Sequence, residues 1–226
     1  YHDGVNMYAA RDPIGIRPMF YVNFGDDDTD IAFASEVKSL LHFNKKVNIF
    51  PPGYIYDSSA GGFVCYYQVL STHSHIDEFT TIHQELTEAV RKRVCNTERP
   101  IAFLLSGGLD SSIMAAVGKK ILGKQIKTFS IGIPGSPDCV AAKQMADHLG
   151  SDHTEVTFNT ADGIAAIPDV IQCLETYDTT TIRASIPMWF LLKYISENTD
   201  CKVIISGEGS DELFGGYLYF HYAPSF

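Results

Sequence analysis

The chain has 226 residues, which is enough for one large domain or two small ones. Apolar residues make up 45% of it and charged residues 19%, a globular balance that excludes disordered, collagen-like and mucin-like proteins. The formal net charge of -10 does not favour binding to nucleic acid or to an anionic membrane through the overall field. No stretch approaches the roughly 18 uncharged apolar residues of a membrane span, so we expect neither a nucleic acid nor a membrane partner.

The first part of the chain, to about residue 70, is predicted to be a piece of an antiparallel sheet domain. Its apolar runs are short and rich in β-forming residues, and turn residues such as Pro51-Pro52-Gly53 separate them. One short helix is expected over Ser35–Leu41. The predicted strands cover residues 7–10, 19–22, 31–34, 54–56 and 63–67.

A polar segment, Ser71–His75, follows the last of these strands and is interpreted as a linker. We place the domain border between residues 72 and 73. His73 and His75 lack a supporting pattern of further ligands, so exposed linker histidines are favoured over a metal site.

The second part alternates continuous apolar runs with segments of helical periodicity. This alternation predicts a parallel, doubly wound α/β sheet, whose ligands bind beyond the carboxyl ends of the strands. The expected strands are 101–105, 127–133, 153–158 and 202–205, and the expected helices are 79–94, 109–122, 138–149, 164–174 and 185–198.

The segment Ser106–Ser112 directly follows one of these strands and directly precedes a helix. Its two glycines allow backbone N–H groups to approach an anion closely, its serines add hydroxyl donors, and the helix directs its positive end there. Asp110 is suited to hold Mg²⁺ bridging phosphate oxygens. The segment lacks the Gly-Lys-Ser/Thr of a Walker A loop. The alternative is an ordinary Gly-Gly turn with a serine N-cap.

A second glycine-rich segment, Ser206–Gly216, follows the last predicted strand and carries three carboxylates. Asp211 can supply a second Mg²⁺ contact opposite Asp110, and Glu208 can act as a general base or bind an ammonium ion. The alternative is that Asp211 and Glu212 only stabilise the first turn of a helix. Two such segments at strand ends of one sheet favour the functional interpretation.

Ser106–Ser112 matches the pyrophosphate loop of the ATP pyrophosphatase group, and together with Ser206–Gly216 it resembles the synthetase domain of glutamine-hydrolysing asparagine synthetases. Other stretches resemble the same synthetase domain in order and spacing, namely 136–138, 146–150, 175–185 and 217–221. Residues 10–18, 34–36 and 51–53 resemble the later half of that family's glutaminase domain.

The resemblance implies the fold and the activity. Residues 1–72 are expected to be the C-terminal part of a type 2 glutamine amidotransferase domain, an antiparallel Ntn-hydrolase sheet. Residues 73–226 are expected to be the N-terminal part of the synthetase domain, which is adenine nucleotide alpha hydrolase-like. The implied reaction is ATP-dependent amidation of aspartate through β-aspartyl-AMP. It gives asparagine, AMP and pyrophosphate, with ammonia from glutamine.

The resemblance also implies roles for individual residues. Asp110 and Asp211 are expected to bind Mg²⁺. Glu208 is expected to act in forming the intermediate or in deprotonating ammonium. Thr180, Thr181 and Arg183 are candidates to hold aspartate or its adenylate, with a structural ion pair at a helix start as the alternative for Arg183. ATP and pyrophosphate are expected at Leu105, Ser106, Gly107, Gly108, Leu109, Asp110, Ser111, Ser112, Ile131, Ser206 and Gly207.

The chain departs from the family at its start. The family's glutaminase uses an N-terminal cysteine, whereas this chain begins with Tyr1, so we expect an internal piece of a longer enzyme that has no glutaminase activity by itself. The five cysteines are odd in number and contain no CxxC pair, which indicates a reducing cytosol. A homodimer is expected for the full-length enzyme.

Two other interpretations remain. One is a different user of the same loop, such as a β-lactam-forming, tRNA-modifying or GMP-forming enzyme. The block 175–185 and the glutaminase-like part favour the asparagine type, and the chain lacks the basic face of a tRNA enzyme. The other is a catalytically inactive module that has kept the fold, which the presence of Asp110, Asp211 and Glu208 disfavours.

Overall fold

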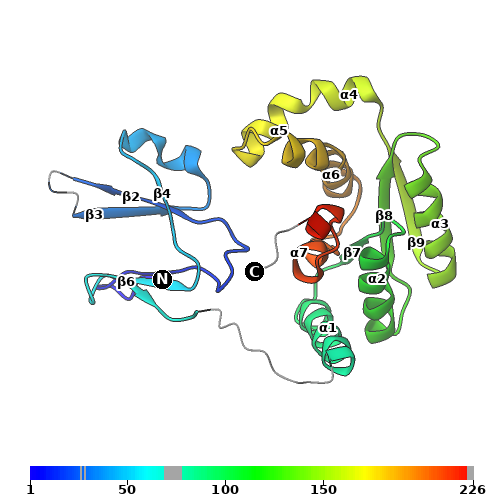
Figure 1. The fold of residues 1–226 in the computed structure, drawn as a ribbon, viewed down its shortest axis with the longest axis horizontal. Coiled ribbons are helices and arrows are strands. Elements are labelled where there is room, and N and C mark those ends of the chain that lie inside the picture. The colour runs from blue at the N-terminus through cyan, green and yellow to red at the C-terminus, as the bar shows by residue number, and fades with distance from the viewer. Residues whose placement is uncertain (26, 28, 69–77, 223–226) are drawn as a thin grey trace. The chain divides into compact units, whose positions relative to one another are not determined.

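The computed structural model describes the chain except residues 26, 28, 69–77 and 223–226, and the chain divides into two compact units, residues 1–74 and 75–226 (Figure 1). The predicted linker Ser71–His75, including His73, His75 and the expected domain border, lies outside the described residues.

The first unit contains two three-stranded antiparallel sheets. One has the order β1-β5-β6 and the other β3-β2-β4, and every pairing within them is antiparallel. The strands are β1 (Tyr8–Ala10), β2 (Phe20–Phe24), β3 (Asp30–Ala34), β4 (Asn48–Ile49), β5 (Tyr54–Asp57) and β6 (Gly62–Cys65). The expected antiparallel character of this part is therefore confirmed. The two-residue β4 was not predicted.

Aromatic side chains join the two sheets of this unit. The ring of Tyr21 on β2 lies 4.9 Å from that of Phe63 on β6, and Phe33 on β3 lies 5.2 Å from Tyr56 on β5. Phe50 is fully buried and packs against Phe63 at 5.1 Å between ring centroids. Such ring contacts add to the free energy from apolar burial, so this cluster forms the unit's core.

The stretch 10–18, quoted above for its family resemblance, is held by one arginine. The guanidinium of Arg11 donates to the carbonyl oxygens of Gly15, Arg17 and Phe50 at 2.7 to 2.9 Å. Asp12 accepts from the backbone N–H groups of Ile16 and Arg17, and these bonds lower the pKa of its carboxyl group. The observed contacts of this motif are therefore structural.

The second unit is built on a parallel sheet of order β10-β7-β8-β9. The strands are β7 (Ile101–Leu104), β8 (Lys127–Gly132), β9 (Asp152–Thr157) and β10 (Val203–Ile205). The helices are α1 (Glu78–Cys95), α2 (Leu109–Leu122), α3 (Pro137–Leu149), α4 (Thr160–Ala165), α5 (Ile167–Leu174), α6 (Thr179–Asn198) and α7 (Ser210–Phe214), and 3₁₀ turns cover Val37–Phe43 and Leu218–Tyr222. The alternation of strands and helices matches the predicted α/β class.

Both faces of the sheet are covered, as doubly wound sheets require. Alternate residues of β7 point to opposite sides, because side chains of a strand alternate between its faces. Phe103 packs in a cluster with residues of α1, α2 and α3, whereas Ala102 and Leu104 pack with Leu191 and Ile195 of α6. The nearly continuous apolar run in β7 follows from burial on both sides.

The predicted and observed helix boundaries differ most at α6. The sequence predicts a start at Ser185, near Pro187, but the helix begins at Thr179 and contains Pro187 in its interior. Asp178 caps this start, because its Oδ2 accepts from both the backbone N–H and the hydroxyl of Thr181 at 2.7 Å. The cap supplies the first turn, whose N–H groups have no helical partner.

None of the helices in the described part of the chain is long and apolar enough to cross a membrane. All five cysteines are free thiols, and Cys139 and Cys201 are buried.

Candidate functional site

In the second unit the strand order reverses between β7 and β10, which makes this the topological switch point of the parallel sheet. From β7 the chain proceeds through α2 to β8 on one side, and it returns later through α6 to β10 on the other. Open α/β sheets bind ligands at the carboxyl ends of strands on either side of such a point. Ser106–Ser112 begins one residue beyond the end of β7, after Leu105, and Ser206–Gly216 directly follows β10, so both segments lie at this position.

A pocket opens at this edge of the sheet and is lined by both segments. Asp110 and Ser111 come from the start of α2, Ile131 from the end of β8, and Glu208 and Asp211 from the segment after β10. The lining residues are Leu104, Leu105, Ser106, Asp110, Ser111, Phe129, Ser130, Ile131, Asp138, Met188, Leu191, Ser206, Gly207, Glu208, Gly209, Ser210, Asp211, Glu212 and Tyr217.

Two serines fix the shape of the first segment. The buried Ser111 hydroxyl lies 2.9 Å from the Ser106 hydroxyl and accepts from the backbone N–H of Ser106 at 3.1 Å. The Ser106 hydroxyl also accepts from the backbone N–H of Gly108 at 3.3 Å. Gly108 is the N-cap of α2 and has no side-chain capping bond, so the alternative of a turn with a serine N-cap is not what the structure shows. The first N–H groups of α2 are available to an anion.

Two glycines allow the backbones around the pocket to approach closely. A Cβ atom on Gly207 would lie 2.9 Å from the backbone carbon of Asp110 and from the backbone nitrogen of Ser111. Gly107 has a φ of +82°, and a Cβ there would collide with the backbone of Ala141 and Ala142 on α3. The contact between the two segments therefore requires glycine at position 207.

The carboxylates of the second segment have different surroundings. Glu208 is exposed and Asp211 is half-buried. Glu212 accepts a hydrogen bond of 2.7 Å from the hydroxyl of Tyr217, which lowers the pKa of Glu212 and raises that of Tyr217 to about 12. Tyr217 therefore stays protonated at neutral pH. Among the residues that the structure describes, the side-chain carboxylates of Glu208 and Asp211 form no hydrogen bond or ion pair, unlike that of Glu212.

The structure does not bring every predicted site residue to the pocket wall. Thr180, Thr181 and Arg183 lie in the first turns of α6, are exposed and do not line the pocket, and the Thr181 hydroxyl is engaged with Asp178. The side chain of Leu109 is 75% exposed. Gly107, Gly108, Leu109 and Ser112 are likewise outside the lining.

A metal site made by protein ligands alone is absent from the described residues, where no group of three or more His, Cys, Asp and Glu side chains is placed to hold an ion. Asp110 and Asp211 nevertheless both line the pocket. Two carboxylates are a donor set suited to Mg²⁺, which keeps several waters and is usually bound through one or two carboxylates together with substrate phosphates.

Sequence reasoning missed several pocket residues. Met188 and Leu191 reach the pocket from the middle of α6, and Tyr217 reaches it from beyond α7. Ser130 lies directly before Ile131, and Asp138 lies in the first turn of α3. The only sequence signal for Asp138 and Tyr217 was their place in stretches that resemble the family.

Two comparisons of the sequence with known proteins name the same family. The sequence model of the family described as asparagine synthase matches residues 81–226. An asparagine synthetase [glutamine-hydrolyzing] of Gallus gallus is 42% identical over 97% of this chain and 45% of that protein. One of Arabidopsis thaliana is 45% identical over 97% of this chain and 40% of that protein, and a probable one of Schizosaccharomyces pombe is 42% identical over 99% and 44%. The chain thus spans less than half the length of these relatives.

Proposed function

The chain belongs to the asparagine synthase family, and we propose from this that its second unit binds ATP and activates aspartate for conversion to asparagine. One observation carries the proposal. Two glycine-rich segments that follow neighbouring parallel strands share a single pocket at the switch point of the sheet, and each contributes an aspartate to it. A polyphosphate next to carboxylates needs both N–H donors and a cation, and this pocket has the residues for each.

The proposal assigns the nucleotide to the walls of this pocket. Leu105, Ile131, Ser206 and Gly207 line it and are assigned to ATP, with the pyrophosphate end at the start of α2. The segment Ser106–Ser112, including Gly107, Gly108, Leu109 and Ser112, holds the β- and γ-phosphates through its backbone N–H groups. Asp110 and Asp211 bind Mg²⁺, which neutralises phosphate charge when bound.

The reaction proceeds in two steps, adenylation of aspartate and then attack by ammonia. An oxygen of the aspartate side-chain carboxylate attacks the α-phosphorus of ATP, so a P–O bond forms to aspartate, the bond between the α- and β-phosphates breaks, and pyrophosphate leaves. The nitrogen of ammonia then attacks the activated carbonyl carbon, and AMP leaves with the bridging oxygen. Glu208, which lines the pocket and is exposed, accepts the proton from ammonium. The other residues mainly position the two anions and neutralise their charge.

Domain roles, the aspartate site, the location in the cell and the oligomeric state complete the proposed function. Residues 1–72 belong to a glutamine amidotransferase domain that supplies ammonia in the full-length protein, and 73–226 belong to the synthetase domain. Thr180, Thr181 and Arg183 hold aspartate or its adenylate from the start of α6. The free cysteines are consistent with the proposed location in the cytosol. The full-length protein is proposed to form a homodimer.

Product analysis tests the proposed reaction. The intact protein is incubated with ATP, Mg²⁺, aspartate and ammonium chloride, and AMP, ADP, pyrophosphate and asparagine are quantified. We expect asparagine, AMP and pyrophosphate in equal amounts, and none of the three when aspartate is left out. Formation of ADP and phosphate in place of AMP and pyrophosphate contradicts the proposal.

Gly207→Ala should weaken ATP binding by at least about tenfold, or roughly 1.4 kcal/mol, because the added Cβ pushes the two segments apart. Isothermal titration of ATP measures the effect, and far-ultraviolet circular dichroism checks that the fold is kept. Gly108→Ala is the comparison, because its Cβ would meet only the Ser106 hydroxyl oxygen, at 3.4 Å. Equal losses in the two variants would show that the close approach at Gly207 is unimportant.

A further inference from the structure

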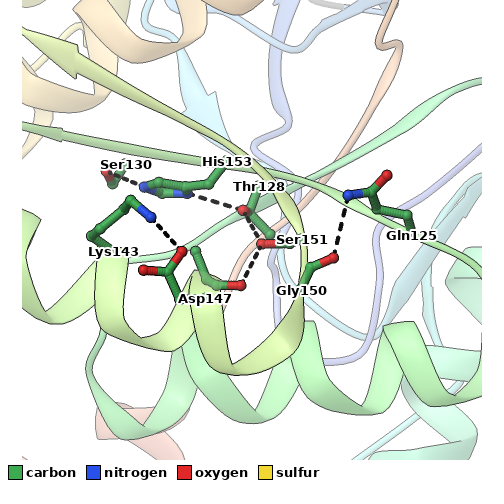
Figure 2. Close-up of polar contacts among 9 residues, drawn as sticks. Gln125, Thr128, Ser130, Lys143, Asp147, Gly150, Ser151 and His153 are labelled. Atoms are coloured by element: carbon green, nitrogen blue, oxygen red, sulfur yellow. Dashed lines mark hydrogen bonds and ion pairs between the residues drawn. The ribbon is translucent and has the colours of Figure 1, made fainter.

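A series of hydrogen-bonded side chains runs from the sheet edge beside the pocket to the end of α3 (Figure 2). Thr128 and Ser130 on β8 face His153, which lies opposite Thr128 on β9. The Nδ1 atom of His153 lies 3.0 Å from the Thr128 hydroxyl, and its Nε2 atom lies 3.1 Å from the Ser130 hydroxyl. The Thr128 hydroxyl in turn lies 2.8 Å from that of Ser151.

One hydrogen bond in this series has a fixed direction. The Ser151 hydroxyl donates to the carbonyl oxygen of Ala146 on α3 at 3.3 Å, and a carbonyl oxygen can only accept. Each hydroxyl has one proton. Ser151 must therefore accept from Thr128, and Thr128 must accept from Nδ1–H of His153. A neutral imidazole then has only an acceptor at Nε2, so the Ser130 hydroxyl donates to it.

The surroundings of His153 favour its neutral form. Burial is the largest cause that lowers the pKa of this imidazole, and the ammonium of Lys143 on α3 lowers it further. Glu155 on β9 and Asp147 on α3 act in the opposite direction and are outweighed. Lys143 and Asp147 also form an ion pair with each other, which weakens the effect of each charge on the ring.

The series of hydrogen bonds ends at the pocket, because Ser130 lines the pocket and is only 4% exposed. Its neighbour Ile131 lines the same wall. We propose that His153 is a positioning residue of this pocket: its neutral ring, held in the Nδ1–H form by Thr128, keeps the hydroxyl proton of Ser130 directed at Nε2 and fixes this end of β8. The inference rests on the proposed function only for the identity of the ligand, a nucleotide.

Protonation of His153 reverses the direction of the hydrogen bond between the Ser130 hydroxyl and Nε2. Nε2 then becomes a donor, the Ser130 hydroxyl has to accept from it, and the serine proton loses its acceptor while a cation is added beside Lys143. Because the pKa of His153 is lower in the folded protein than its ordinary value of 6.5, the unfolded chain takes up the proton more readily. The contribution of His153 to stability is complete above pH 6.5 and falls as the pH drops from there to the folded pKa.

Nitrogen-15 NMR of the ring nitrogens tests the assignment without any ligand. In the intact protein at pH 8, labelled at histidine and assigned by comparison with His153→Gln, we expect a protonated Nδ1 and an unprotonated Nε2. An Nε2–H form, or exchange between both forms, overturns the proposed proton order.

ATP titrations at pH 8 and pH 5 test the positioning role. Between pH 8 and pH 5 we expect the wild type to lose more ATP affinity than His153→Gln does. Only the fraction of molecules with a neutral His153 keeps the correct arrangement, and the apparent affinity falls with that fraction. Gln keeps one donor and one acceptor but does not titrate in this range. ATP itself titrates here, so only the difference between variants is interpreted.

His148→Gln is the matched control, since His148 is an exposed histidine on α3. It should follow the wild-type profile. If His153→Gln also follows that profile, the positioning role is wrong. If the wild type does not bind ATP at any pH, the proposed function fails, and the NMR result alone decides the proton order. Thermal melts of each variant at both pH values separate lost binding from lost folding.

Discussion

Asp110→Asn in the intact protein should lower the rate of aspartate-dependent ATP–pyrophosphate exchange by at least about 100-fold. The carboxylate lies in the first turn of α2 and lines the pocket, where it is proposed to bind the Mg²⁺ that accompanies the phosphates. A neutral amide is a weaker ligand for this ion and leaves the phosphate charge less compensated. Incorporation of labelled pyrophosphate into ATP measures the exchange.

Asp169→Asn is the control for this substitution. Asp169 also lies in the first turn of a helix, α5, and does not line the pocket. It should keep the wild-type exchange rate, since only the general interaction of a carboxylate with a helix start is lost. Near-normal exchange in folded Asp110→Asn would exclude Asp110 from the phosphate site.

Glu208→Gln should leave ATP binding within about tenfold of the wild type, or roughly 1.4 kcal/mol, and remove asparagine formation. The reason is that Glu208 is assigned to proton transfer from ammonium, a role that the amide cannot fill. Its backbone N–H donates to the Ser206 hydroxyl at 3.1 Å, a bond that the substitution retains, so the segment should keep its shape. Titration with ATP and product analysis give the two quantities.

Glu212→Gln removes the same charge four residues away and serves as the control. The amide oxygen can still accept from the Tyr217 hydroxyl, so turnover should stay within about tenfold of the wild type. An ATP affinity that falls as far as turnover in Glu208→Gln would mean that Glu208 binds the nucleotide and does not act in catalysis.

The sequence predicted the architecture of the second unit because its signals are local. The fully apolar run of β7 and the helical spacing of α2 can be recognised within single segments, and the observed α2 has the predicted bounds. The position of the two glycine-rich segments then followed from the rule that parallel strands present their carboxyl ends at one edge.

Features that depend on tertiary packing could not be predicted. The start of α6 was placed too late, because Pro187 and the threonines before it disfavour a helix locally, whereas Asp178 supplies a cap. Met188 and Leu191 reach the pocket only through the packing of α6 on the sheet. The pairing of His153 with Thr128 and Ser130 joins neighbouring strands about 25 residues apart. Residue spacing within one segment cannot show such a pairing.

The origin of one oxygen atom in AMP tests the central claim most directly. The intact protein is supplied with aspartate labelled with oxygen-18 in its side-chain carboxylate, together with ATP, Mg²⁺ and ammonium, and the released AMP is analysed by mass spectrometry. If the carboxylate attacks the α-phosphorus, AMP carries one labelled oxygen, because that oxygen stays on phosphorus when ammonia attacks the carbonyl carbon. Unlabelled AMP, or label in inorganic phosphate accompanied by ADP, would contradict the proposed adenylation of aspartate.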